Sequence, residues 1–294
     1  MRFGNKFEHR CFNDFAEEIM RFEYRIVTRT ASRHRRSEDA CEAMIDSLNR
    51  FVAVVADGHG PDLQTDRAQE LSKQVASELV REVVERQDLG VFPEICGAVQ
   101  TRVKVTFKKI PVGAVATCVV ADERGITIAQ VGDCVVLKFI PDESFRVERL
   151  TQDHVPDNPT EIPRLRPYYA DGKFDSHIYE HGNFCVSRLH CKKTGATAAF
   201  TRSFGDPDFR PIVTHEPEVK FFEHVSEDEL YAVCSDGGED TARIAFRRLK
   251  NKRVPHDDQF MDTLERFATE ELPDRPDDDI TIIFFRVLRD SPTS

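Results

Sequence analysis

Acidic residues stand at the ends of apolar runs in several parts of the chain. They are Asp57 after FVAVVA, Asp133 between two apolar runs, Asp236 after YAVCS, and Asp278 just before ITIIFF. If the apolar runs are strands, their ends can meet at one edge of a packed sheet. Carboxylates gathered there repel one another, so they either keep protons or hold a cation. Oxygen ligands alone favour a hard cation, Mg²⁺ or Mn²⁺, over zinc.

Each acidic motif also has an ordinary interpretation when it is taken alone. Asp-Gly is the commonest hairpin turn signal, so Asp57-Gly58 or Asp236-Gly237 is equally typical of a plain turn, and Asp171-Gly172 is interpreted only as a turn. The pair Glu38-Asp39 alone is typical of an exposed acidic surface. The order of the motifs along the chain therefore carries more weight than any one of them.

The elements that position these residues are predicted from apolar periodicity. Residues 23–29 alternate like a half-buried strand, and residues 51–56 are typical of a strand that is buried on both faces. The spacing over residues 63–87 predicts a long amphipathic helix packed on a sheet. A short helix is expected over residues 12–20. The strands over residues 23–29 and 51–56 both lead toward acidic residues.

The middle of the chain predicts an antiparallel meander, with a tight turn at Gly132-Asp133. Its strands are expected over residues 116–122, 126–131, 134–140 and 144–150. Further elements are a strand over 229–235, helices over 241–249 and 259–271, and a closing strand over 280–287. Runs of strands and runs of helices, rather than strict alternation, predict an α+β layered sandwich with helices outside.

In this order the motifs resemble the metal-dependent serine/threonine phosphatases of the protein phosphatase 2C type, of which the chain is identified as a somewhat divergent member. The matching landmarks are SEDA at 37, FVAVVADGHG at 51, GAVATCVV at 113, VGDCV at 131, LTQDHVPDNPTE at 150, TRSFGDPDF at 201, EPEV at 216, CSDGGED at 234 and DDIT at 278. The resemblance implies a four-layer α-β-β-α sandwich, with two antiparallel sheets flanked by helices. It also implies one phosphatase domain over residues 1–294, with an expanded flap at about 158–197.

The resemblance implies a centre for two Mn²⁺ or Mg²⁺ ions and a third, weaker site. Asp57 corresponds to the bridging carboxylate, and Asp236 and Asp278 complete one site. Glu38 and the carbonyl group of Gly58 serve the other. The additional metal corresponds to Asp133 and Asp240, which fit the acidic positions of the family.

The resemblance also implies how the substrate is cleaved. Two cations lower the pKa of a water between them, and the resulting hydroxide attacks phosphorus in line. Asp39 corresponds to the acceptor that orients a metal-bound water, and His59 to the general acid that protonates the leaving alkoxide. A histidine in this position without the surrounding motif would be interpreted as a surface turn residue.

The chain departs from the family pattern where the substrate phosphate is held. The family carries an arginine four residues before its Glu-Asp pair, and here that position is His34. Arg33 or Arg35 can replace it as phosphate ligands, because a guanidinium binds phosphate through its planar fork. The alternative is that SRHRR is an ordinary solvated basic segment. A smaller departure is Pro61, which follows the DGHG motif.

A second departure is the segment 158–197, where substrate selection is expected to reside. It carries histidines and cysteines with ligand-like spacing: His177, His181, Cys185, His190 and Cys191. We interpret them as ordinary residues of a flap and do not predict a zinc site.

Composition limits the partners. The 294 residues carry a formal net charge of -11, which argues against binding nucleic acid or an anionic membrane. The eight cysteines show no CxxC pair and are expected to be reduced core thiols. No apolar run approaches the ~20 residues of a membrane span. We expect a monomer in the cytoplasm, with the nucleus as the alternative location, and a phosphorylated protein as its partner.

The predicted function is hydrolysis of phosphoserine and phosphothreonine in proteins. One alternative is a catalytically impaired pseudophosphatase that acts as a binding or scaffold module. Another is a two-metal hydrolase for a phosphoester that is not a protein. Nucleotide-driven and other hydrolytic classes find no support, because the chain has no GxxxxGK[ST], HExxH or GxSxG motif.

Overall fold

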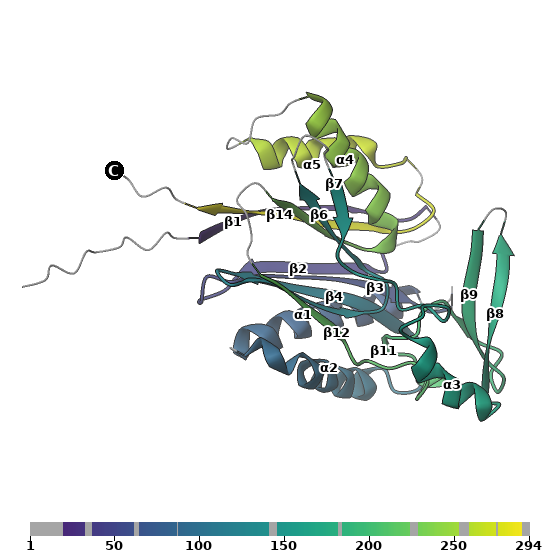
Figure 1. Cartoon of the computed structure of the whole chain (residues 1–294). Coiled ribbons are helices and arrows are strands. Elements are labelled where there is room, and N and C mark those ends of the chain that lie inside the picture. Colours follow the sequence, from purple (N-terminus) through teal and green to yellow (C-terminus); the bar gives the residue numbers. More distant parts are fainter. Residues whose placement is uncertain are drawn as a thin grey trace, which may run out of the picture.

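Two antiparallel sheets lie face to face between two layers of helices in the computed structural model (Figure 1). The structure describes residues 20–32, 37–61, 65–86, 88–140, 146–181, 184–223, 229–252, 259–274 and 276–289. The first sheet has the order β1 (Met20–Arg29), β14 (Ile280–Arg289), β13 (Leu230–Cys234), β6 (Val135–Ile140) and β7 (Arg146–Arg149). The second has the order β12 (Glu218–Glu223), β5 (Gly125–Val131), β4 (Gly113–Asp122), β3 (Phe51–His59) and β2 (Asp39–Ile45).

Each sheet has one face against the other sheet and one face against helices. The helices α1 (Thr65–Glu85) and α2 (Phe92–Thr106) cover the second sheet, and α4 (Glu239–Lys252) and α5 (Phe260–Glu271) cover the first (Figure 1). The predicted four-layer α-β-β-α sandwich is therefore confirmed.

The continuous apolar run of β3 is explained by this layering. Phe51 and Val55 pack between the sheets, whereas Val52 and Val54 pack under the helices. Because successive side chains of a strand point to opposite faces, a strand with two buried faces needs apolar residues at every position. The strand expected over residues 51–56 is thus confirmed and extends to His59.

The long amphipathic helix is also confirmed, as α1. Its buried stripe consists of Ala68, Leu71, Val75, Leu79 and Val83. These residues belong to the apolar core under the second sheet. The helix expected over residues 12–20 falls outside the described residues, except for Met20, which begins β1.

The predicted meander is wrong at its centre. β4 and β5 form a hairpin in the second sheet, but β6 pairs with β13 in the first sheet. At Gly132-Asp133 the chain therefore crosses between the sheets instead of folding back. Gly132 has φ 108°, and a side chain there would overlap Val115. A turn signal does not say which partner the next strand takes, and strands that are apolar on both faces leave that choice open.

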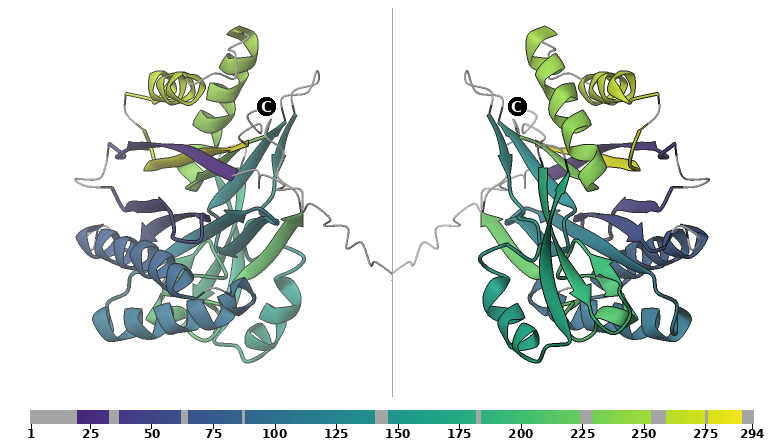
Figure 2. Two further views of the ribbon diagram at one scale, coloured as in Figure 1. Left: turned by 90° about the vertical axis from the view of Figure 1, so that its left-hand side faces the viewer. Right: turned by 90° about the vertical axis from the view of Figure 1, so that its right-hand side faces the viewer.

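A small third sheet lies at one end of the sandwich. It consists of β8 (Phe174–His181), β9 (Phe184–Cys191) and the short β10 (Thr197–Ala198), and it follows α3 (Ile162–Ala170). The right-hand view of Figure 2 shows the β8–β9 hairpin in front of that end. These elements occupy the segment that the sequence assigned to a flap.

Six cysteines have side chains that the structure describes: Cys41, Cys96, Cys118, Cys134, Cys191 and Cys234. They are free thiols, and all except Cys41 are buried. None of the helices described has the length and apolar character that crossing a membrane requires.

Candidate metal centre

The pairing of β2 with β3 places two of the predicted site residues opposite each other, Asp39 and Asp57. Asp39 is buried, and its Oδ2 accepts a hydrogen bond of 2.7 Å from Ser235 Oγ at the end of β13. Ser235 in turn donates its N–H to the carbonyl oxygen of Thr281 in β14. Asp39 therefore links the start of β2 in the second sheet to the end of β13 in the first.

The carboxylates that follow other strands converge on Asp57. Burial raises the pKa of Asp57 well above its usual value, and the negative charges of neighbouring aspartates raise it further. These neighbours are Asp39, Asp236, Asp133 and Asp278. Because the effect of a charge weakens with distance, this shift indicates that residues from both sheets and from the crossover between them lie around Asp57.

Two other members of this cluster are perturbed in the same direction. Burial raises the pKa of Asp39 to about 7, and the charge of Asp279 adds to the effect against a hydrogen bond from Ser235. Burial and the charge of Asp236 raise the pKa of Asp133 to about 7. Without a cation the cluster therefore holds protons near neutral pH.

Gly58 allows Glu38 to approach Asp57. The Gly58 N–H donates to the carbonyl oxygen of Glu38 over 3.1 Å. A Cβ atom at Gly58 would lie 2.6 Å from the carbonyl oxygen of Ala68 and 2.8 Å from that of Glu38. Only glycine fits where β3, α1 and the start of β2 meet, as the DGHG motif requires.

Asp279, which the sequence did not single out, holds the same corner together. Its side chain is buried and accepts hydrogen bonds of 2.6 Å from the N–H groups of Ala31 and Glu38. It thereby ties the end of β1 and the start of β2 to the start of β14. The signal that could have revealed it is the run of three aspartates before β14.

Asp236 and Asp240 differ in their contacts with neighbouring residues. Asp236 opens a short 3₁₀ helix, Asp236–Gly238, and its Oδ1 accepts a 2.7 Å hydrogen bond from the N–H of Gly237. Asp240 lies exposed in the first turn of α4. Among the contacts described, none joins Asp240 to the other carboxylates, so its role as a ligand stays a prediction.

His59 lies beside the cluster and is held by residues far along the chain. Its Nε2 lies 2.8 Å from Asp206 Oδ2, and its ring packs on Phe200 with 4.0 Å between the ring centroids. Ser203 Oγ donates to the same oxygen of Asp206. A side chain at Gly113 would overlap both His59 and Asp206, so this glycine makes room for the pair.

His59 and several of the carboxylates line one cleft of about 950 Å³. Glu38, Asp57, His59 and Asp278 lie on its wall, and the hairpin contributes Arg188 from β9. Among the lining residues that the structure describes, Arg188 is the only lysine or arginine. No sequence pattern marks Arg188 as a site residue, because it is one arginine in a segment of mixed charge.

The predicted phosphate ligands Arg33 and Arg35 lie outside the described residues, as do His34 and Arg36. The residues on either side lie next to the carboxylates, since the N–H groups of Ala31 and Glu38 both donate to Asp279, the neighbour of Asp278. The assignment of Arg33 and Arg35 as phosphate ligands stays a prediction.

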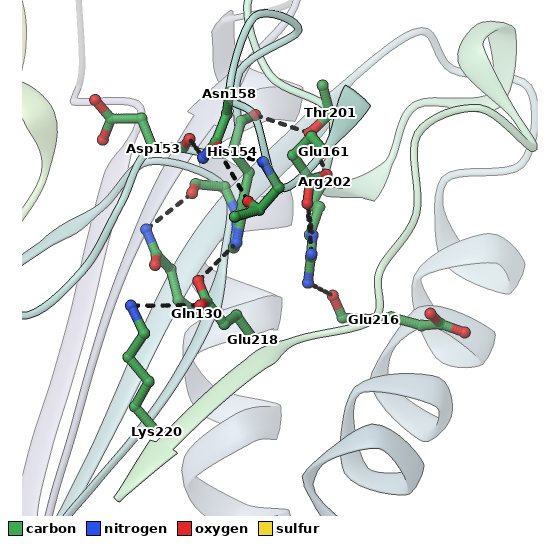
Figure 3. Close-up of polar contacts among 12 residues, drawn as sticks. Gln130, Asp153, His154, Asn158, Glu161, Thr201, Arg202, Glu216, Glu218 and Lys220 are labelled. Carbon is green, nitrogen blue, oxygen red and sulfur yellow. Dashed lines mark hydrogen bonds and ion pairs between the residues drawn. The ribbon is translucent and has the colours of Figure 1, made fainter. Parts of the chain in front are cut away.

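A buried polar network fixes the crossover that carries Asp133 (Figure 3). His154 Nδ1 accepts a hydrogen bond of 3.1 Å from the N–H of Gly132, and Gln130 Nε2 donates to the carbonyl oxygen of Gly132 over 3.0 Å. Burial, together with the positive charge of Arg202, lowers the pKa of His154 to about 4. The imidazole is therefore neutral near pH 7, as its acceptor role requires.

Glu161 joins two of the sequence landmarks in the same network (Figure 3). It is completely buried and receives hydrogen bonds from Thr201, Arg202 and Arg164. Burial opposes its ionisation, but these hydrogen bonds prevail and lower the pKa of Glu161 to about 2. Arg202 of the TRSFGD landmark is thus a structural ion-pair partner.

The residues of the cluster fit a hard divalent cation. Their side-chain donors are carboxylate oxygens, the ligands that Mg²⁺ and Mn²⁺ prefer. In the part of the chain that the structure describes, Asp39 Oδ1 is buried and has no hydrogen-bond partner. A buried acceptor in that state normally has an ion or a water beside it. The carboxylate oxygens that gather at this cleft are therefore of the chemical type that holds a hard divalent cation.

Comparison with known proteins identifies the family. The sequence model of the family Protein phosphatase 2C matches residues 31–238, which is more than half of the chain. The chain therefore belongs to the protein phosphatase 2C family.

The individual relatives are distant. A probable protein phosphatase 2C 9 of Oryza sativa subsp. japonica is 27% identical over 237 residues, which cover 72% of this chain and 53% of that protein. This chain thus spans about half the length of that relative.

Solved structures share the fold at low identity. The serine-threonine phosphatase 2C from Toxoplasma gondii is similar with a TM-score of 0.64 and 16% identity, over 91% of this chain and 95% of that one. The catalytic domain of the phosphatase PstP, solved in complex with 2 manganese ions, has a TM-score of 0.56 and 15% identity, over 92% of this chain and 100% of that one.

Proposed function

We propose that the chain is a metal-dependent protein phosphatase that hydrolyses phosphoserine and phosphothreonine in protein substrates. The observation that carries the proposal is the cluster of aspartates around Asp57, which shares one cleft with His59 and Arg188. Membership of the protein phosphatase 2C family supports it. We treat residues 1–294 as one domain, with the segment 158–197 as its flap.

The cofactors in this proposal are two Mn²⁺ or Mg²⁺ ions. Asp57, Asp236 and Asp278 would hold these ions together with Glu38 and the carbonyl group of Gly58. Asp133 and Asp240 would serve a third, weaker site. The manganese ions of PstP, a protein with this fold, support the choice of ion. When bound, the cations supply Lewis-acid activation of water and neutralise phosphate charge.

The chain's own residues supply the remaining steps. Asp39 accepts a hydrogen bond from the attacking water through Oδ1, because Ser235 already occupies Oδ2. His59 donates a proton to the serine or threonine oxygen that leaves, and Asp206 holds the imidazole ring in place. Arg188 balances the charge of the phosphate from the hairpin side of the cleft. Arg33 and Arg35 are proposed as further phosphate ligands.

The test is phosphate release from a phosphothreonine peptide with and without Mn²⁺ or Mg²⁺. Activity is expected only with cation, and Asp57→Asn and Asp236→Asn each lower it by at least about 10³-fold, since the lost electrostatic stabilisation is several kcal/mol. The matched control is Asp171→Asn, an exposed aspartate after α3. Undiminished turnover in excess chelator contradicts the proposal.

A second function, a pseudophosphatase that binds partners without turnover, is favoured by Pro61 in the cleft wall. Retention of the mutually repelling carboxylates argues against it, because a scaffold gains nothing from them. Calorimetry with Mn²⁺ separates the two functions. A chain that neither binds the cation nor turns over substrate is the scaffold, and small phosphate esters tested beside phosphopeptides identify a hydrolase for other phosphoesters.

A further inference from the structure

The β8–β9 hairpin brings together residues that are far apart in the sequence. Its register places Asp175 opposite His190 and His177 opposite Arg188. Ser187, Leu189 and Cys191 of β9 are buried. Because side chains alternate along a strand and directly paired residues share a face, Asp175, His177, Arg188 and His190 lie on the other, more exposed face.

Three of these side chains form a tight cluster. Asp175 Oδ1 lies 2.9 Å from His177 Nε2 and 3.1 Å from His190 Nδ1. One potential ligand atom from each of the three residues lies within 4.8 Å of the other two. The other carboxylate oxygen, Asp175 Oδ2, lies 3.4 Å from Lys192 Nζ. One oxygen therefore faces the two imidazoles, while the lysine holds the other.

We propose that Asp175, His177 and His190 bind one divalent cation of the zinc class. Two imidazole nitrogens and one carboxylate oxygen are a ligand set that zinc uses, with a water in the fourth position. Nitrogen donors favour such ions over Mg²⁺ and Mn²⁺, which prefer oxygen. The chain would then hold a hard cation in the carboxylate centre and a softer one on the hairpin.

The ligand set differs from the residues whose spacing drew attention in the sequence. Cys191 is buried on the opposite face of β9, so it does not belong to the cluster. Asp175, which the spacing did not include, lies at its centre. The side chains of His181 and Cys185 fall outside what the structure describes. Cross-strand register, rather than sequence spacing, selects the ligands.

The state of the three side chains suits capture of an ion from solvent. Slight burial raises the pKa of Asp175, but hydrogen bonds from Lys192 and His190 and the charge of His177 outweigh this effect, and the net shift is downward. The carboxylate is therefore ionised at neutral pH. The side chain of His177 is 50% exposed and that of His190 is 29% exposed, so both rings are accessible.

The location gives the ion a structural consequence at the cleft. Arg188, which lines the cleft, lies directly opposite His177 and two positions from His190. An ion held by residues of both strands would fix β8 against β9 at the positions beside Arg188. This inference stands on the hairpin alone and does not depend on whether the carboxylate centre hydrolyses phosphate.

The test is titration of the untagged full chain with Zn²⁺ by calorimetry, in a saturating concentration of Mg²⁺ that occupies the carboxylate centre. One equivalent is expected to bind. Co²⁺ as a second probe should give the visible absorption of a site with nitrogen ligands. Asp175→Asn, His177→Gln and His190→Gln should each weaken Zn²⁺ binding by at least about 10-fold, the smallest loss seen even for residues behind the ligands.

Two controls make the result decisive. His215→Gln replaces a half-buried histidine outside the hairpin and should leave Zn²⁺ affinity unchanged. Asp57→Asn damages the carboxylate centre and should leave the zinc equivalent in place, although phosphatase activity is lost. No zinc equivalent in Mg²⁺, equal affinity in the three hairpin variants, or loss of the equivalent in Asp57→Asn overturns the proposal. Failure of the phosphatase proposal shows instead as absent turnover in the parent chain.

Discussion

His59 and Asp206 are 147 positions apart in the sequence, and 2.8 Å separates His59 Nε2 from Asp206 Oδ2. Asp206 has a left-handed backbone conformation with φ 50°, which is uncommon for a residue with a side chain. Its N–H donates to the carbonyl oxygen of Val112, and Ser203 holds its carboxylate. The strained backbone and these contacts fix Asp206 so that it orients the imidazole.

The first prediction concerns this pair. Asp206→Asn should lower kcat for a phosphothreonine peptide by about 10-fold or more, because general acid catalysis depends on the position of the imidazole. The loss should be much smaller for an aryl phosphate, whose leaving group needs no proton. Asp208→Asn, a neighbour in the same cleft wall, is the control. Equal losses for both substrates would show that Asp206 acts on something other than the acid.

The second prediction concerns the phosphate ligands. Arg188→Ala should raise KM for a phosphothreonine peptide about 10-fold, the value of one hydrogen bond to a charged group. Arg33→Ala and Arg35→Ala are expected to act in the same direction if SRHRR holds phosphate. The exposed Arg166 of α3 gives the matched control, Arg166→Ala. Steady-state kinetics that leave KM unchanged in all three variants contradict this assignment.

The third prediction is a pH dependence of stability in the absence of cations. The pKa values of Asp39 and Asp133 are raised to about 7 in the folded chain from an ordinary value of 3.8. Between these values the folded state binds more protons than the unfolded state, so the free energy of unfolding falls as pH rises through this window. In chelator, Tm at about pH 8 should therefore be lower than at about pH 5.5, by at least about 2 °C.

Two further measurements check the cause of that dependence. Added Mn²⁺ should raise Tm most at the higher pH, because the cation replaces the protons that are lost there. Asp39→Asn should flatten the dependence on pH, since it removes one of the titrating groups. A Tm that is independent of pH in chelator would mean that the pKa values of Asp39 and Asp133 are the same in the folded and unfolded states.

The carboxylate centre was largely predictable from the sequence, whereas the contacts that support it were not. Asp57, Asp236 and Asp278 each follow or precede a strand with a strong apolar pattern, so local sequence reveals their place. Asp206 and Glu161 carry no such signal, because their roles depend on partners 147 and 41 positions away. Spacing within one segment cannot report a contact of that kind.

Two of the elements that were missed differ in how strong their sequence pattern is. The β8–β9 hairpin has a weak pattern, because it packs only one face on the molecule, and that face includes polar or small residues such as Ser187 and Cys191. α2 was missed although it carries a signal, since Ile95, Val99 and Val103 recur every four residues and are buried. The crossing at Gly132-Asp133 was hidden for another reason, namely that β6 is apolar on both faces and fits either sheet.

The last prediction concerns the buried network around Glu161. Glu161→Gln removes the charge that balances Arg164 and Arg202, and breaking a buried ion pair in this way should cost at least about 2 kcal/mol. The Tm of thermal unfolding should then fall by about 4 °C or more. Glu216→Gln is the matched control, because Glu216 is exposed and only its backbone carbonyl accepts from Arg202 (Figure 3).

Thr201 and His154 connect Glu161 to Gly132, the neighbour of Asp133. Glu161→Gln should therefore also weaken cation binding at Asp133. A stable Glu161→Gln variant with unchanged cation affinity would refute this link.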